Sequence, residues 1–125
     1  MKLSIILLLF SISIYAKPIT EVQVKHSDVT NKVYEARAGL EIKEDQLEKY
    51  FKKGAIKVIK KSIDFTKQKL LVFGWRGSGG DKIDYVVLES YPEQIAFTKT
   101  RGRTRDLRSH IHIYVLRKNV SWSIK

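Results

Sequence analysis

The strongest pattern along the chain is a run of apolar residues at 69–75. An almost continuous apolar run of this length is typical of a strand that is buried on both faces. Shorter segments around it alternate apolar and polar positions, as half-buried strands do. The segments that we expect to form strands are 19–24, 69–75, 83–89, 94–100, 107–116 and 120–124, and 32–36 could add another.

One segment has helical spacing instead. Leu47, Tyr50 and Phe51 fall on one helical face, the acidic pair 44–45 precedes them in the first turn, and Gly54 can stop the helix after two lysines.

The next segment, 55–61, fits a short second helix or a β-branched strand. The whole pattern predicts an α+β domain with a single, mostly antiparallel sheet of about five to six strands, packed against one or two short helices.

Residues 1–16 have the features of an export signal. Lys2 is followed by an apolar stretch, and Ala16 is a small residue suited to cleavage before Lys17. The stretch is shorter than the ~20 residues that span a bilayer. We therefore expect a signal peptide at 1–16 and one secreted or periplasmic domain at 17–125, without a transmembrane segment.

Composition narrows the classes of fold. The chain has no cysteine, which excludes a disulfide-stapled mini-protein and a thiolate zinc site. Its formal net charge is +11, and losing Lys2 with the signal would leave +10. The charge is uneven: residues 49–82 carry +8, residues 83–98 carry −3 and residues 99–125 carry +7. Such a polarised surface favours acidic partners.

Arginine is concentrated in one segment. Four of the seven arginines lie in the loop at 100–108, whereas seventeen lysines supply basic charge elsewhere. A guanidinium makes bidentate contacts with carboxylates and phosphates that an ammonium cannot make. This loop is therefore a candidate binding surface.

A glycine-rich loop, 76–81, joins the segments 69–75 and 83–89, which we expect to form a hairpin. Successive amides of such a loop could bind an anion, although the loop lacks the ending of a nucleotide-binding P-loop. We expect Asp81 or Asp106 to pair with at least one arginine. The candidate binding residues of the two loops are Arg76, Ser78, Gly79, Gly80, Asp81, Arg101, Arg103, Thr104, Arg105, Asp106, Arg108 and His110.

Residues 110–114 alternate strictly, which places His110, His112 and Tyr114 on one face of a strand. Two histidines at this spacing could bind a metal with a third ligand such as His26, but an ordinary polar sheet face is the favoured interpretation. We expect no metal and no cofactor.

Small, basic, exported domains include ribonucleases, in which a histidine and a carboxylate or second histidine transfer protons while arginine holds the phosphate. The residues that could take these parts here are His110, His112, Glu89, Glu93, Arg103 and Arg105. Their order matches no nuclease motif.

Two motifs resemble a known group. The segment 64–81, DFTKQKLLVFGWRGSGGD, followed by Phe97-Thr98 and by GRTRDLR at 102–108, resembles small exported bacterial proteins of unknown function, over about residues 40–125. More distantly, the helix, Asp-Phe pair, apolar strand and Gly-rich turn resemble the PrcB C-terminal-like domain, which is associated with bacterial surface protease complexes. Asp81 stands where that domain usually has an aromatic residue. The resemblance implies an exported domain and no particular reaction.

The leading hypothesis is a non-enzymatic exported binding domain whose two loops contact an acidic protein or polyanion. The alternatives are a secreted ribonuclease-like phosphodiesterase and nonspecific electrostatic binding to nucleic acid or anionic lipid.

Overall fold

The computed structural model describes residues 17–35 and 38–125. The expected signal peptide at 1–16 therefore lies outside the described residues. The described strands are β1 (Ile19–Val22), β2 (Leu40–Ile42), β3 (Gln68–Gly77), β4 (Lys82–Leu88), β5 (Gln94–Thr100), β6 (Arg108–Arg117) and β7 (Ser121–Ile124). The helical segments are η2 (His26–Asp28), η3 (Asn31–Glu35), η4 (Glu44–Gln46), α2 (Leu47–Tyr50) and α3 (Lys53–Ser62). Within these ranges, no helix has the length and apolar character needed to cross a bilayer.

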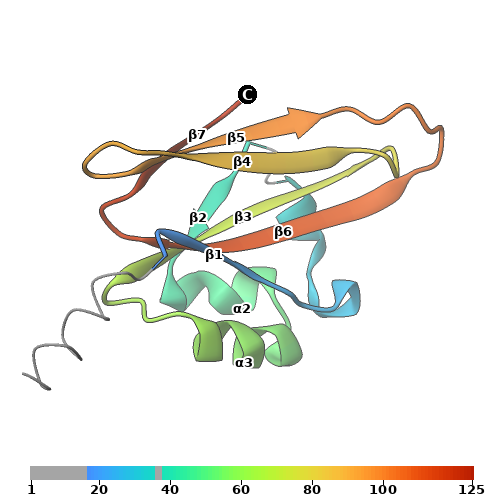
Figure 1. The fold of residues 1–125 in the computed structure, drawn as a ribbon. Helices are drawn as coiled ribbons and strands as arrows, with labels where there is room; N and C mark the ends of the chain where they lie inside the picture. The colour runs from blue at the N-terminus through green and yellow to red at the C-terminus, as the bar shows by residue number, and fades with distance from the viewer. Residues whose placement is uncertain (1–16, 36–37) are drawn as a thin grey trace, which may run out of the picture.

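The strands form two sheets stacked on one another, with the helices below the first sheet (Figure 1). The first sheet has the order β1-β6-β3-β2 and is antiparallel throughout. In the second sheet, of order β4-β5-β7, the β4–β5 pair is antiparallel and the β5–β7 pair is parallel. The α+β class is thus confirmed, but the prediction of a single sheet of five to six strands is wrong.

The long antiparallel pair of β3 and β6 explains why there are two sheets. These strands pair along their whole length, from Gln68 opposite Arg117 to Gly77 opposite Arg108. Residues 70–75 of β3 are all buried, so both faces of the strand need a covering layer, as its apolar run predicted. The helices cover one face and the second sheet covers the other.

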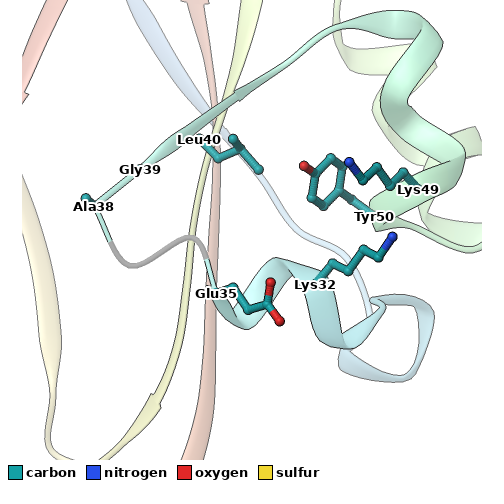
Figure 2. A pocket seen from close by; sticks show the side chains of 7 residues that line it. All are labelled: Lys32, Glu35, Ala38, Gly39, Leu40, Lys49 and Tyr50. Atoms are coloured by element: carbon teal, nitrogen blue, oxygen red, sulfur yellow. The ribbon is translucent and has the colours of Figure 1, made fainter.

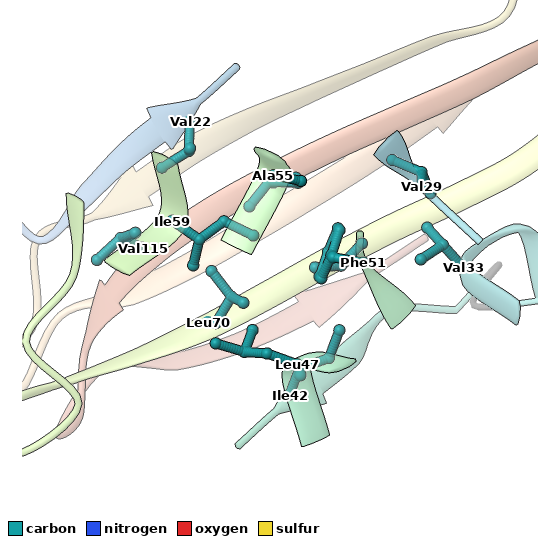
Figure 3. Packing of buried hydrophobic residues seen from close by; sticks show 12 residues of the cluster. Val22, Val29, Val33, Ile42, Leu47, Phe51, Ala55, Ile59, Leu70 and Val115 are labelled. Atoms are coloured by element: carbon teal, nitrogen blue, oxygen red, sulfur yellow. The ribbon is translucent and has the colours of Figure 1, made fainter. Parts of the chain in front are cut away.

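Alternate residues of β3 enter two different cores. On the helix side, Leu70 and Val72 pack with Phe51, Ala55 and Ile59 from the helical region (Figure 3). On the other side, a second cluster fills the space between the sheets, made of Ile19, Leu71, Phe73, Trp75, Ile83, Ile95, Phe97, Tyr114, Leu116 and Val120. The period of two along a strand separates the two sets of side chains.

The helical region departs from the prediction at its end. A helical segment begins at Glu44 as expected. However, α2 ends at Tyr50, because the backbone there forms hydrogen bonds with the segment 28–30 instead of continuing the helix. The Thr30 N–H donates to the Tyr50 carbonyl at 2.9 Å, and the Lys52 N–H donates to the Asp28 carbonyl at 2.8 Å. Gly54 does not end a helix; it lies in the first turn of α3, so residues 55–61 are helical.

The predicted strand at 32–36 is wrong as well. Residues 31–35 form the 3-10 helix η3, and residue 36 lies outside the described ranges. Fully buried Val33 anchors this turn against β3, where a side chain at Gly74 would meet the Val33 carbonyl oxygen at 2.4 Å. The other expected strands are confirmed to within two residues at each end.

Candidate functional site

Both predicted loops lie at the same edge of the molecule. Each of them crosses from one sheet to the other: 78–81 joins β3 to β4, and 101–107 joins β5 to β6. Gly77 pairs with Arg108 in the first sheet and Lys82 pairs with Thr100 in the second, so the four strand ends meet here. The predicted hairpin between 69–75 and 83–89 is wrong, because β3 pairs with β6 and β2 instead. The loops are nevertheless neighbours.

The loops are joined by a network of polar contacts. The hydroxyl oxygens of Ser78 and Thr104 lie 2.6 Å apart. The Gly79 N–H donates to Asp106 Oδ1 at 3.1 Å. The Gly80 N–H is shared between the same two hydroxyls, at 3.2 Å from Ser78 Oγ and 3.3 Å from Thr104 Oγ1. The amides of the glycine loop therefore bind oxygens of the chain itself, and the predicted nest for an external anion is not open at these two positions.

Asp81 links the loops to the core between the sheets. Its carboxylate accepts from the Gly102 N–H at 2.7 Å and from the Trp75 indole N–H at 2.9 Å. The Gly102 amide, and after it the Trp75 indole, hold the pKa of Asp81 below its ordinary value. The carboxylate is therefore ionised at neutral pH and fixed to both loops.

Asp106 makes the expected pair with an arginine. The Arg108 Nε donates to Asp106 Oδ2 at 2.9 Å, so the predicted internal ion pair is confirmed at Asp106 rather than at Asp81. The Thr104 hydroxyl, the Gly79 amide and the Arg108 guanidinium together hold the pKa of Asp106 far below its ordinary value.

We expect Asp81→Ala to loosen the junction between the loops. The substitution leaves the Gly102 N–H and the Trp75 indole N–H without their acceptor, so exchange of the Gly102 amide should accelerate by about tenfold or more at neutral pH. Hydrogen exchange followed residue by residue measures this. Asp84→Ala, on the exposed face of β4, is the control and should leave the rate unchanged. Equal rates in Asp81→Ala and the wild type would contradict a joining role for Asp81.

The same contacts predict how the junction responds to acid. Because the pKa values of Asp81 and Asp106 are lowered in the folded state, their contribution to stability is complete above the ordinary pKa of Asp. It is lost only as the pH falls through the lowered values. The junction should thus persist into moderately acidic solution.

Three arginines of the loop point outward. Arg101, Arg103 and Arg105 are exposed, and their guanidinium groups make no ion pair or hydrogen bond with another described residue. A hollow of about 430 Å³ beside this loop is lined by Gly79, Gly80, Thr104, Asp106, Arg108, Ser109 and His110. We call these three arginines and this hollow the guanidinium rim.

Arg76, which we expected in the same surface, lies apart from it. Its guanidinium donates to Asn31 Oδ1 at 2.9 Å and sits 4.9 Å from the ring centre of Tyr34. Both partners belong to η3, on the helix side of the first sheet. The alternation of β3 explains this placement, because Trp75 faces the second sheet and its neighbour must face the other way.

The two histidines of β6 do not line an open polar face. Both rings stack on the buried indole of Trp75, His110 at 4.9 Å and His112 at 5.5 Å between ring centres. The His110 Nε2 lies 2.7 Å from the Ser78 carbonyl oxygen, which can only accept, so this nitrogen carries a proton. Burial lowers the pKa of His112 despite Glu21 nearby, which favours its neutral form. His110 thus contacts the glycine loop directly, whereas His112 packs on Trp75 and, among the described residues, makes no hydrogen bond or ion pair with either loop.

Three residues of the site were not expected from the sequence: Trp75, Lys99 and Ser109. Of these, Ser109 lines the hollow beside the loops. Trp75 lies in an apolar strand, so its position suggests only core packing, yet its indole holds Asp81. The Lys99 ammonium lies 4.3 Å from the ring centre of Trp75, a cation–π contact from the second sheet. Only the adjacency of Trp75 to the glycine loop in sequence could have suggested a role in the site.

The residues that we considered for a nuclease are separated. Glu93 pairs with Arg117 at the far end of β6, and Glu89 follows β4 at that same end. Arg117 is seven residues from His110 along the strand, or about 23 Å at the usual rise per residue. Neither carboxylate can therefore share a substrate atom with His110.

A second hollow lies between η3, β2 and α2, on the helix side of the molecule (Figure 2). The residues that line it are Lys32, Glu35, Ala38, Gly39, Leu40, Lys49 and Tyr50. It shares no lining residue with the guanidinium rim.

No protein-family model, curated protein or solved structure matches the chain. The expected resemblances to small exported bacterial proteins and to the PrcB C-terminal-like domain remain predictions from the sequence.

Proposed function

We propose that this protein is a non-enzymatic, exported binding domain, and that its guanidinium rim contacts an acidic protein or another polyanion. The observation that carries the proposal is that exposed cations project from two loops whose backbones are held in place by hydrogen bonds. Two loops are tied together by hydrogen bonds, and Arg101, Arg103 and Arg105 project from them without an internal partner among the described residues.

The fixed frame favours binding because less order has to be created when a partner arrives. Asp81 and Asp106 hold the loop backbones in place, so the loop entropy is already lost in the unbound protein. Both carboxylates are also occupied by internal donors. The Arg108 guanidinium balances the charge of Asp106, so the three outward arginines leave the two loops with a net positive charge in spite of the ionised Asp81.

The choice of arginine supports a partner that carries carboxylate or phosphate groups. The α3 helix shows what the chain does elsewhere: its exposed cations are Lys53, Lys57, Lys60 and Lys61, with no arginine among them. Guanidinium groups form paired hydrogen bonds with planar anionic groups, whereas ammonium groups act as point charges. A surface whose cations are arginines can recognise the planar geometry of an anionic group in addition to its charge.

We expect the double substitution Arg103→Ala with Arg105→Ala to raise the Kd for an acidic probe by about tenfold or more, because charge-assisted hydrogen bonds are lost. Suitable probes are a fluorescent polyglutamate peptide and inorganic polyphosphate, titrated at low and at physiological salt. Anisotropy or calorimetry supplies the Kd.

Two matched variants decide the interpretation. Lys57→Ala with Lys60→Ala removes the same charge from α3, and should change the Kd only slightly. Arg103→Lys with Arg105→Lys keeps the charge but removes the guanidinium groups. Its Kd should be raised nearly as much as that of the double alanine variant. Equal weakening by the α3 variant would instead indicate nonspecific electrostatic binding, with a steep dependence on salt. Incubation with RNA tests the nuclease alternative, and cleavage that requires His110 would contradict a purely binding role.

A further inference from the structure

The outward face of α3 carries only one kind of charge. Ala55 and Ile59 of this helix are buried in the helix-side core. At about 100° per residue, the lysines of α3 fall within one arc on the opposite side. The exposed side chains of this arc, which we call the lysine row, are Lys53, Lys57, Lys60 and Lys61. The row extends along the helix for about 12 Å at the usual rise per residue.

No acidic residue balances the lysine row. Residues 49–62 contain six lysines and neither Asp nor Glu, and no lysine of the row makes an ion pair with another described residue. Like charges three or four residues apart destabilise a helix. Lys57 has such a neighbour at Lys53, at Lys60 and at Lys61. The helix therefore keeps a repulsive array that one glutamate would relieve, and such an array favours an anionic partner.

A hollow of about 510 Å³ lies beside the row. On the side of α3 it is lined by Gly54, Ala55 and Val58, and across from the helix by Val24 and Lys25, with Asp28 also in its lining. Val58 is 41% exposed and follows Lys57 on the flank of the helix. Cations and an aliphatic surface thus lie side by side, which is the combination found where proteins rest on a bilayer surface.

We propose that α3 docks this domain on an anionic lipid bilayer, with the lysine row against the headgroups and Val58 at their edge. The apolar residues of α3 are already used in the core, so the helix stays within the fold and does not insert. The attraction between the lysines and the anionic headgroups supplies the binding energy.

The form and chemistry of the row favour a bilayer over a soluble polyanion. Figure 1 shows α3 on the outside of the helical layer, on the side of the molecule away from the second sheet. The helix has no arginine to grip a single phosphate or carboxylate group, and no aromatic side chain on which a nucleic-acid base could stack. A bilayer presents many mobile charges at once, which separate, flexible lysines can bind without a fixed geometry.

The first experiment measures partition of the purified protein onto phosphatidylcholine vesicles made with and without phosphatidylglycerol. The protein should bind the anionic vesicles alone and should leave them as salt is added. Lys57→Gln with Lys60→Gln should lower the partition coefficient by about tenfold or more, since each lysine near an anionic surface contributes about fivefold.

The matched control removes two lysines from the second sheet. Lys82→Gln with Lys125→Gln lowers the net charge equally, at exposed positions, and should change the partition coefficient by less than about twofold because salt screens distant charges. Lys57→Arg with Lys60→Arg keeps the charge and should bind the vesicles as the wild type does. Thermal melts establish that the variants fold.

The second experiment tests orientation. The chain has no cysteine, so one introduced cysteine can carry an environment-sensitive fluorophore. The label on Val58→Cys should brighten on anionic vesicles and should be quenched by lipids with a nitroxide near the headgroup. The label on Ser123→Cys, exposed on β7, should respond to neither.

Three results would overturn the proposal. One is a protein that does not prefer anionic over neutral vesicles, another is an equal loss in the second-sheet variant, and the third is an equal response of the Ser123 label. An α3 variant that loses binding to RNA or polyphosphate, but not to vesicles, would assign the row to a soluble polyanion instead. The lysine row shares no residue with the guanidinium rim, so none of these results bears on the rim.

Discussion

Phe73→Ala should lower the free energy of unfolding by about 3–5 kcal/mol, the usual cost of truncating a fully buried phenylalanine. Phe73 has no exposed surface. Its ring centre lies 4.8 Å from that of Phe97, 5.8 Å from that of Trp122 and 6.1 Å from that of Tyr114. The three neighbours come from β5, β7 and β6, so the cavity would open where the two sheets meet and no single strand could move to fill it.

Urea or guanidinium unfolding followed by tryptophan fluorescence measures this loss. The matched control is Phe65→Ala, because Phe65 is only partly buried at the margin of the helix-side core. Its replacement should cost clearly less. Similar losses in the two variants would contradict a central role for Phe73 in holding the sheets together.

Gly102→Ala should separate the two loops and cost about 1–3 kcal/mol, as overpacking of a closed contact does. A side chain at Gly102 would meet the carbonyl carbon of Gly80 at 2.3 Å, its Cα at 2.5 Å and the Asp81 nitrogen at 2.6 Å. All three are backbone atoms, which cannot rotate away. The hydrogen bond from the Gly102 N–H to Asp81 would be stretched or lost with them, and binding of polyglutamate at the guanidinium rim should weaken.

Gly54→Ala provides the contrast. Its new methyl group would lie 2.7 Å from Asp28 Oδ2, the end of a side chain that can turn aside. Alanine also favours the helical backbone of α3 over glycine. We expect this variant to be as stable as the wild type or slightly more stable, and to bind the probe normally. If Gly102→Ala behaved in the same way in unfolding and binding assays, the close contact of the loops would not be required.

The sequence could predict the elements of this fold better than their partners. The apolar run in β3 indicated burial on both faces, and the structure places a core on each side of it. The same run could not tell that β6, distant in sequence, would be its long neighbour. Local pattern sets the spacing of side chains within a strand, whereas pairing depends on which faces are covered once the chain has collapsed. The hairpin expected between β3 and β4 was wrong for this reason.

The candidate site shows the same division. Unusual composition located both loops, and their internal acid–arginine pair was expected. The positions of individual side chains could not be predicted, because they depend on which face of a strand each residue occupies and on neighbours from other elements. Arg76 follows Trp75 by one residue and so faces η3, away from the other arginines. His110 and His112 alternate as a polar face does, yet they stack on an indole that only the tertiary structure brings to them.

The shared wall of β3 and β6 has a consequence for how the molecule comes apart. Consecutive residues of these strands, such as Leu71 and Val72, belong to opposite cores. Unfolding the helical layer would expose one face of the β3–β6 pair to water, and detaching the second sheet would expose the other face. Neither layer can detach without exposing apolar side chains of the strand pair to water. Heat or denaturant should therefore unfold the domain in one cooperative step, without a partly folded intermediate that proteases could cleave.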